Sequence, residues 1–220
     1  MSVITGTESD RKFTNRQQAG KELAAELAQR DYPEPVVLAL PRGGVPVAYE
    51  VAQVLHAPLQ VIVVRKLGAP QNPEYGVGAI SEGSVVVLNE ALLQALEIED
   101  RELQPIMTKE RQELERRKYV YRHQEPLPSL TGKTAILVDD GIATGYTMLA
   151  AMEAVTNLDA QKIVVAVPVC AADTAILLEG EVDELVCLLR PTYLQAVGLH
   201  YQEFDEVSDD EVTAFLSYDH

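Results

Sequence analysis

Two adjacent carboxylates, Asp139 and Asp140, stand between an apolar run and a loop of small and hydroxyl-bearing residues. The apolar run, residues 136–138, is typical of a buried parallel strand. Methionine and valine recur at helical spacing over residues 148–155, which predicts a helix after the loop. The stretch is therefore expected to form a strand, a loop and a helix in succession.

The loop over residues 141–147 offers the groups that an anion needs. Open α/β sheets bind ligands at the carboxyl ends of their strands, where helix N-termini present backbone N–H groups. The hydroxyls of Thr144 and Thr147 add donors, and Gly145 lets the main chain approach closely. This loop predicts a phosphate cradle, and the plainer alternative is a glycine that merely turns the chain.

The aspartate pair needs a different ligand, because a carboxylate next to a phosphate repels it. Vicinal hydroxyls of a sugar, or a divalent cation, would satisfy Asp139 and Asp140. A sugar phosphate therefore fits the whole loop better than a bare phosphate. The alternative is that the two aspartates only complement a helix dipole.

Two further strand ends carry positive charge. The run 36–40 is followed by Pro41, Arg42, Gly43 and Gly44 and by a predicted helix over 47–55, and the run 59–64 is followed by Arg65 and Lys66. A cation with flexible residues at a strand end suits a second phosphate. The alternatives are an ordinary turn at 41–44 and a solvated loop at 65–66. Three such segments together favour one shared anion site.

The elements that must position these segments alternate between strand and helix. Further strands are expected at 79–80, 85–88, 162–167 and 184–189, and helices at 14–30, 90–96, 103–122, 173–178 and 209–216. A capping box of Ser208 with Glu211 opens the last helix. The glycine- and proline-rich segment 68–78 is expected to be a long, mobile turn segment. The pattern predicts a single α/β domain over 1–220, with an open, mostly parallel sheet and helices on both faces.

The composition narrows the choice of partners. Lys and Arg number 18 against 34 Asp and Glu, a formal net charge of −16 that argues against a nucleic-acid surface. Cys170 and Cys187 lie in apolar runs without metal-ligand spacing, so buried, reduced thiols are expected. Without an apolar run of about 18 residues, the sequence predicts no membrane span and a cytoplasmic protein.

Residues 136–147 (ILVDDGIATGYT) resemble the signature of the type I phosphoribosyltransferases, which bind phosphoribosyl pyrophosphate (PRPP). The segments PRGGVPVA, RKLGAPQNPE, GAISEG and ELERR are similar to a group of predicted phosphoribosyltransferases of unassigned acceptor. The resemblance implies that Asp139 and Asp140 hold the ribose hydroxyls. It implies a 5′-phosphate loop made of Ala143, Thr144, Gly145, Tyr146 and Thr147.

Two residues depart from patterns in that family. Tyr146 stands where a small residue is more usual. Ala143 stands where the hypoxanthine-guanine members carry an aspartate, whereas the adenine-type members also have alanine. Because Ala143 removes the obvious loop carboxylate, no acid or base for the acceptor is assigned.

The resemblance also implies roles for the positively charged segments and for the residues near both ends of the sequence. It implies pyrophosphate binding by Arg42, Gly43, Gly44, Arg65 and Lys66. It predicts a cis peptide between Pro41 and Arg42. A flexible loop over about 67–84 would close over the site, and a hood from 1–35 and 190–220 would form the acceptor pocket. Aromatic residues of the hood, Tyr193, Tyr201 and Phe204, would either stack an acceptor base or simply pack.

The implied reaction is Mg²⁺-dependent transfer of the 5-phosphoribosyl group from PRPP to an unidentified nitrogenous acceptor, with release of pyrophosphate. Its catalytic residues would be Asp139, Asp140, Arg42, Arg65 and Lys66. Mg²⁺ would be bound through PRPP and through the two aspartates. The expected partners are PRPP and a small-molecule acceptor, and a homo-oligomer stays open.

Two other functions stay open. A regulatory protein could keep the PRPP site as a nucleotide or PRPP sensor without catalysis. A hydrolase or phosphatase acting on a sugar phosphate would need a nucleophile or a metal cluster, and the sequence shows no His/Asp arrangement with that spacing.

Overall fold

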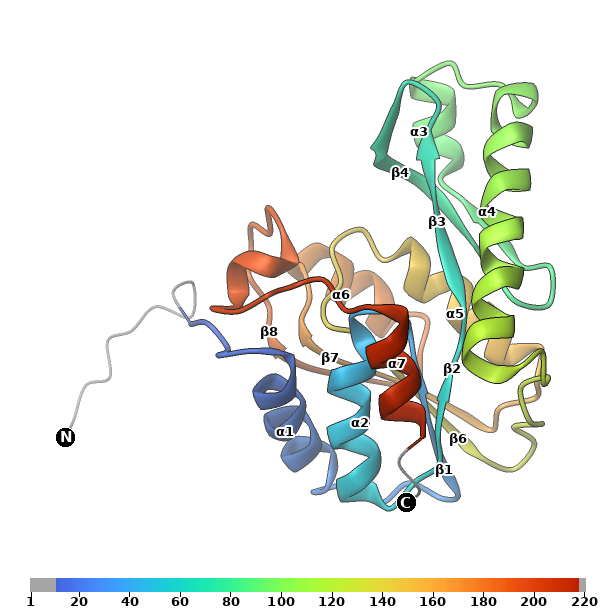
Figure 1. The fold of residues 1–220 in the computed structure, drawn as a ribbon. Helices are drawn as coiled ribbons and strands as arrows, with labels where there is room; N and C mark the ends of the chain where they lie inside the picture. Colours follow the sequence, from blue (N-terminus) through green and yellow to red (C-terminus); the bar gives the residue numbers. More distant parts are fainter. Residues whose placement is uncertain (1–10, 218–220) are drawn as a thin grey trace.

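The computed structural model describes residues 11–217, and its centre is a sheet of five parallel strands (Figure 1). In chain order these strands are β1 (Pro35–Ala39), β2 (Leu59–Val61), β6 (Thr134–Val138), β7 (Lys162–Val169) and β8 (Glu184–Leu189). They lie side by side in the order β2-β1-β6-β7-β8. The expected open parallel sheet is confirmed.

Helices cover both faces of this sheet, as expected. On one face lie α1 (Arg16–Leu27) and α2 (Gly44–Leu55), packed on strand residues such as Val37 and Ile136. On the other lie α5 (Tyr146–Thr156) and α6 (Ala172–Glu179), packed on their neighbours Leu38 and Leu137. Successive side chains of a strand point to opposite faces, so strands buried on both faces must be apolar throughout.

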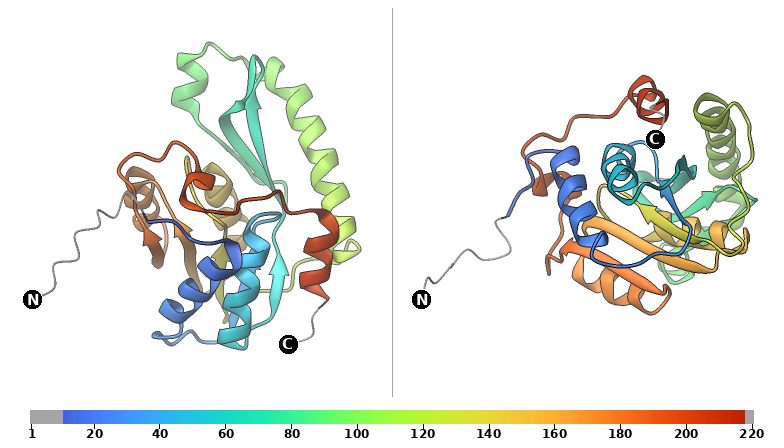
Figure 2. Two further views of the ribbon diagram at one scale, coloured as in Figure 1. Left: turned by 60° about the vertical axis from the view of Figure 1, so that its left-hand side comes forward. Right: turned by 90° about the horizontal axis from the view of Figure 1, so that it is seen from below.

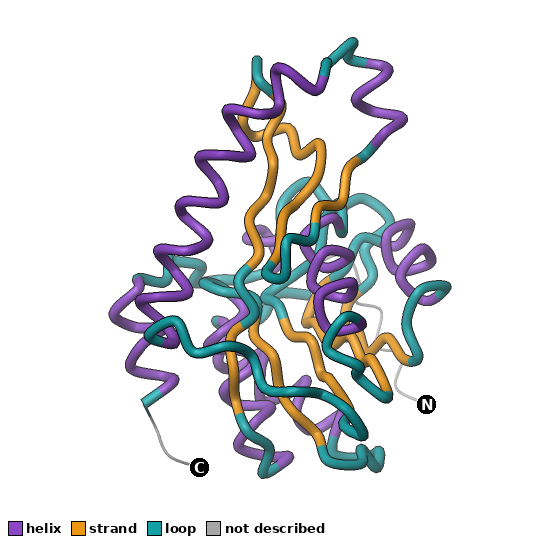
Figure 3. Tube along the Cα trace, turned by 90° about the vertical axis from the view of Figure 1, so that its right-hand side faces the viewer, coloured by secondary structure: helices purple, strands orange, loops and turns teal. Residues whose placement is uncertain are grey.

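A second unit, here called the arm, projects beyond the end of β2 (Figures 1 and 3). It contains the antiparallel strands β3 (Val64–Ala69), β4 (Asn72–Ser81) and β5 (Val86–Leu88) and the helices α3 (Glu90–Ala95) and α4 (Asp100–Arg122). In Figure 3, α4 runs along the length of these strands. The expected strand pair at 79–80 and 85–88 is confirmed by the pairing of β4 with β5.

Two expectations about the arm are wrong. The run 59–64 is not one strand, since β2 ends at Val61 and β3 begins at Val64. The segment 68–78 is not a long turn, because most of it lies in β3 and β4. Its glycines serve close strand contact instead. A Cβ on Gly78 would lie 2.4 Å from the carbonyl oxygen of Val87.

A buried ion pair holds the base of the arm. The guanidinium of Arg122, at the end of α4, contacts the carboxylate of Glu82, which also accepts the N–H of Val63 over 2.8 Å. Both charged side chains are buried, and Nε and Nη1 of Arg122 lack a hydrogen-bond partner among the residues described. The arm is therefore anchored to the end of β2 by a charge pair that is only partly satisfied.

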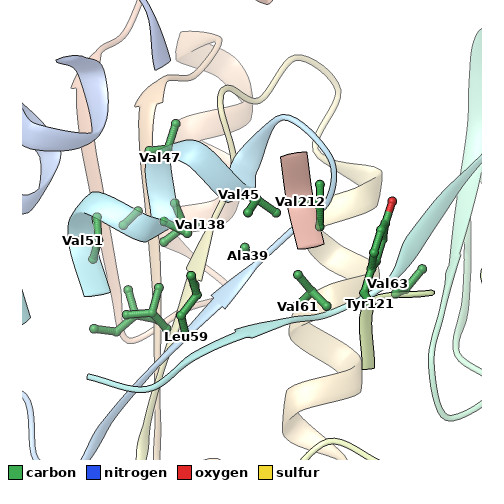
Figure 4. Close-up of a cluster of buried hydrophobic side chains, with 14 of the residues drawn as sticks. Ala39, Val45, Val47, Val51, Leu59, Val61, Val63, Tyr121, Val138 and Val212 are labelled. Carbon is green, nitrogen blue, oxygen red and sulfur yellow. The ribbon is translucent and has the colours of Figure 1, made fainter. Parts of the chain in front are cut away.

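Two segments of the expected hood, for which the name is kept below, lie side by side near Phe13 (Figure 2). Phe13 donates its N–H to the carbonyl of His200, and Gln202 donates to the carbonyl of Phe13, both over 2.8 Å. The C-terminal part comprises the short helix η2 (Val197–His200) and α7 (Asp209–Leu216), opened by the capping box that the sequence predicts. Figure 4 shows Val212 of α7 in a buried cluster with residues of α2 and of three parallel strands. Residues 1–10 and 218–220 of the expected hood lie outside the described residues.

Two further expectations concern the whole chain. Over residues 11–217, no helix has the length and apolar character that crossing a membrane requires. Cys170 is buried and Cys187 half-buried, and both are free of disulfides.

Candidate functional site

The turn at 41–44 and the loop after β6 lie side by side. They follow neighbouring parallel strands, in which Ala39 is aligned with Val138. Gly43 allows the two to touch, since a Cβ on it would lie only 2.0 Å from Oδ2 of Asp140. The peptide between Pro41 and Arg42 is cis, as predicted. Two of the three segments expected to share a site are therefore in contact.

The two aspartates have different partners. Oδ1 of Asp139 accepts the N–H of Asp140 over 2.8 Å, whereas Oδ2 of Asp140 accepts a hydrogen bond from Nε of Arg16 over 2.7 Å. Burial raises the pKa of Asp139 well above its usual range, and the neighbouring charge of Asp140 raises it further. Burial also raises the pKa of Asp140, although Arg16 opposes that rise. Folding thus places the pair where negative charge is costly unless a cation or hydroxyl donor joins it.

The rest of the loop is held in place at the N-terminus of α5. Gly145 has a φ of 82°, which favours glycine, and it forms the N-cap of α5. The hydroxyl of Thr174 donates to the carbonyl of Ala143 over 2.6 Å and so ties the loop to α6. Ala143 and Thr144 are exposed, and Tyr146 and Thr147 are half-buried in the first turn of α5. The loop thus meets solvent at a helix N-terminus, where backbone N–H groups point outward.

Arg42 is held by acidic residues of the hood. Its guanidinium contacts the carboxylate of Glu206 and lies 3.9 Å from that of Asp209. Sequence reasoning missed this contact. The capping box placed Asp209 at a helix start, but nothing in the pattern brings that helix to the 41–44 turn.

Arg65 and Lys66 lie elsewhere than expected. They are inside β3, in the arm, and not in a loop at the edge of the five-stranded sheet. Arg65 donates from Nε to Glu110 of α4 over 2.7 Å. With Lys109 and Glu110, the two residues line a groove of about 360 Å³ between β3 and α4. Their role in pyrophosphate binding stays a prediction.

Hood residues complete the surroundings of the aspartates. The hydroxyl of Tyr201 donates to the carbonyl of Asp140 over 2.6 Å. Phe204 packs against Tyr201, with ring centroids 4.9 Å apart, and the guanidinium of Arg16 lies 3.8 Å from its centroid. Tyr193 is 77% exposed. Tyr201 and Phe204 thus pack against each other, and stacking of an acceptor base stays a prediction.

Mg²⁺ fits this donor set as a shared ion. Over residues 11–217, no group of three or more His, Cys, Asp or Glu side chains could hold a metal ion alone. Magnesium is commonly held by one or two carboxylates together with substrate phosphates. Asp139 and Asp140 can supply the protein's part of such a set.

Comparisons with known proteins agree with this geometry. A family model described as the phosphoribosyl transferase domain matches residues 12–203. Two Mycobacterium tuberculosis proteins, from strains CDC 1551 and H37Rv, are each named "Putative phosphoribosyl transferase" and are 46% identical over 208 residues, or 94% of this chain. The crystal structure of TT1426 from Thermus thermophilus has a TM-score of 0.77 and 41% identity, covering 93% of this chain and 97% of that one. This chain spans 47% of the length of each curated relative.

Proposed function

This chain belongs to the phosphoribosyltransferase family, and we propose that it transfers the 5-phosphoribosyl group of PRPP to a small nitrogenous acceptor, with Mg²⁺ and release of pyrophosphate. The observation that carries the proposal is the contact between the 41–44 turn and the aspartate pair, at which Gly43 leaves no room for a side chain next to Asp140. A cationic turn next to a carboxylate that can accept hydrogen bonds from sugar hydroxyls suits a ligand that carries both pyrophosphate and ribose.

Each part of PRPP has a proposed binding segment. The 5′-phosphate would lie in the loop at 143–147, on the N-terminus of α5. The ribose hydroxyls would donate to Asp139 and Asp140. Pyrophosphate binding is proposed for Arg42, Gly43, Gly44, Arg65 and Lys66. The last two residues would act from the arm, and Arg42 would exchange Glu206 for the ligand.

In the reaction, a nitrogen of the acceptor forms a bond to C1 of the ribose as the bond from C1 to the pyrophosphate oxygen breaks. The electron pair of the broken bond leaves with pyrophosphate, and the proton of the acceptor nitrogen is released to solvent. Mg²⁺ would neutralise charge on the pyrophosphate oxygens. The chain's own part is to orient the sugar through Asp139 and Asp140 and to stabilise the leaving group through Arg42.

A sensor that binds PRPP without catalysis is the second candidate. The contact of Arg42 with Glu206 supports it, because a bound anion would displace this carboxylate and so change the position of residue 206 without any chemistry. We also propose that the acceptor is a small nitrogenous molecule, that the protein is cytoplasmic and that it forms a homo-oligomer. The substrates and partners of the whole protein are part of the same proposal.

The deciding experiment measures pyrophosphate release from Mg²⁺ and PRPP across a panel of purines, pyrimidines and small nitrogen heterocycles. Release that depends on one acceptor is expected from the transferase. PRPP binding without release against any acceptor would favour the sensor. Failure to bind PRPP in calorimetry with Mg²⁺ would contradict both.

A further inference from the structure

Arg16 links the hood to the aspartate pair. Its Nε donates to Oδ2 of Asp140 over 2.7 Å, and the two side chains are only 12% and 14% exposed. A charge-assisted bond in such a sheltered place is stronger than one on the open surface. Arg16 was not among the residues expected to form the site.

The C-terminal segment holds Arg16 in a single position. Nη1 donates to the carbonyl oxygen of Asp205 over 2.7 Å, and the guanidinium lies over the ring of Phe204. A planar guanidinium that is both stacked and hydrogen-bonded keeps little freedom to rotate. Arg16 therefore reaches Asp140 as a prearranged group.

The backbone on both sides of this contact is also fixed. Arg16 is the first residue of α1, and the side chain of the N-cap Asn15 accepts the N–H of Gln18 over 3.0 Å. At the other end of the contact, Tyr201 holds the carbonyl oxygen of Asp140. The hood thus donates hydrogen bonds to both the side chain and the main chain of Asp140.

The contact also decides which carboxylate oxygen a ligand can meet. A Cβ on Gly43 would lie 2.0 Å from Oδ2 of Asp140 and 3.3 Å from Nε of Arg16. Oδ2 is therefore enclosed between Arg16 and the 41–44 turn. Of the two carboxylate oxygens of Asp140, Oδ1 is therefore the one to which the proposal below assigns a hydroxyl donor.

We propose that Arg16 is a positioning residue, which fixes Asp140 in the orientation that presents Oδ1 to the ribose hydroxyls of PRPP. The inference rests on the proposed function. Arg16 acts through Asp140 and needs no contact with the substrate. Lysine carries the same charge but lacks the planar fork, so it replaces only part of this role.

The test compares Arg16→Gln and Arg16→Lys with Arg30→Gln, a control that removes ion pairs just beyond the other end of α1. In calorimetry with Mg²⁺ and PRPP, Arg16→Gln is expected to bind roughly 10- to 100-fold more weakly than the wild type. Arg16→Lys should lie between them, and Arg30→Gln should match the wild type. In steady-state kinetics, the KM for PRPP should rise more than kcat falls, because an oriented Asp140 binds the sugar before and during the reaction.

A thermal double-mutant cycle of Arg16→Gln and Asp140→Asn measures the contact without any ligand. The two changes in Tm are expected to be non-additive, because each single variant leaves the other group without its partner. Additive changes, or PRPP binding by Arg16→Gln equal to that of the wild type, would overturn the inference and leave the proposed function intact. Failure of the wild type to bind PRPP would overturn the proposed function, and this inference with it.

Discussion

The carboxylate of Glu206, a hood residue, contacts the guanidinium of Arg42. Arg42 is the cation of the turn that is proposed to bind pyrophosphate. Glu206 is exposed on its other sides, with 80% of its side chain open to solvent, whereas Arg42 is 27% exposed. The contact is therefore one that an incoming anion can replace at small cost.

Replacing Glu206 with Gln should tighten PRPP binding. The variant removes a carboxylate that competes with pyrophosphate for Arg42, and an exposed ion pair of this kind contributes up to about 1 kcal/mol, or roughly fivefold in Kd. Calorimetry with Mg²⁺ and PRPP measures the change. Glu203→Gln, in the same segment, is the matched control. Unchanged or weaker binding would show that Glu206 does not compete for the site.

Gly43→Ala should impair the site and spare the fold. The new Cβ would meet Oδ2 of Asp140 at 2.0 Å, which forces the carboxylate or the turn to move. PRPP binding is expected to weaken by roughly tenfold or more, with a circular dichroism spectrum like that of the wild type. Gly180→Ala, where a Cβ would find its nearest neighbour at 3.4 Å, is the control. Normal binding by Gly43→Ala would argue against the 41–44 turn as a ligand site.

Asp139→Asn should raise thermal stability and weaken PRPP binding by roughly 10- to 100-fold. Burial and the charge of Asp140 raise the pKa of Asp139, so its ionised form destabilises the fold at neutral pH. The neutral amide removes that cost, but it also removes an acceptor for the sugar, at roughly 1.5–3 kcal/mol of binding. Melting curves at pH 7 and calorimetry measure the two effects. A lower Tm would contradict the electrostatic account of the pair.

Glu113→Gln should remove part of the acid sensitivity of the fold. Hydrogen bonds from Arg116 and Arg117 lower the pKa of Glu113 to about 2. A lowered pKa stabilises the fold above the unfolded value of 4.5, and that contribution is lost as the pH falls from about 4.5 to about 2. Urea unfolding at several pH values should show a smaller loss over this window in the variant. Glu115→Gln, which removes an exposed ion pair with Lys118 on the same helix, should behave like the wild type.

Glu82→Gln should destabilise the base of the arm. It leaves the buried guanidinium of Arg122 without its counter-charge, which typically costs about 3–5 kcal/mol. Urea unfolding measures the loss. Replacing Glu82 and Arg122 together with leucine and methionine should recover much of it, since an apolar pair leaves no buried charge. A double variant no more stable than Glu82→Gln would contradict this account.

The sequence predicted the open, mostly parallel sheet and its loops because their signals are local and agree with one another. A strand buried on both faces is apolar, as in 36–39 and 135–138, and in both cases a glycine-containing turn and a helix follow. The capping box of Ser208 with Glu211 likewise placed α7 within its observed bounds. The adjacency of the 41–44 turn and the aspartates then follows from the pairing of β1 with β6.

The strands of the arm and the contacts of the hood could not be predicted from local sequence patterns. Gly68 and Gly78 look like turn residues, yet each allows close strand contact, with a Cβ prevented by Pro73 in one case and by Val87 in the other. Periodicity cannot distinguish these two uses of glycine. The bond from Arg16 to Asp140 spans 124 positions and depends on how α1 docks, so no local pattern reports it.

Residues 13 and 14 hydrogen-bond to residues 200–203, so the hood closes only when late parts of the chain meet early ones. On the ribosome, Arg16 emerges long before Phe204 and Asp205, and at about 5–20 residues per second the delay is roughly 10–40 s. The early strands can associate during that interval, while Asp140 still lacks its oriented partner. A nascent chain would therefore form its early strands before the contact of Arg16 with Asp140, and residues 200–205 would complete the site proposed for PRPP.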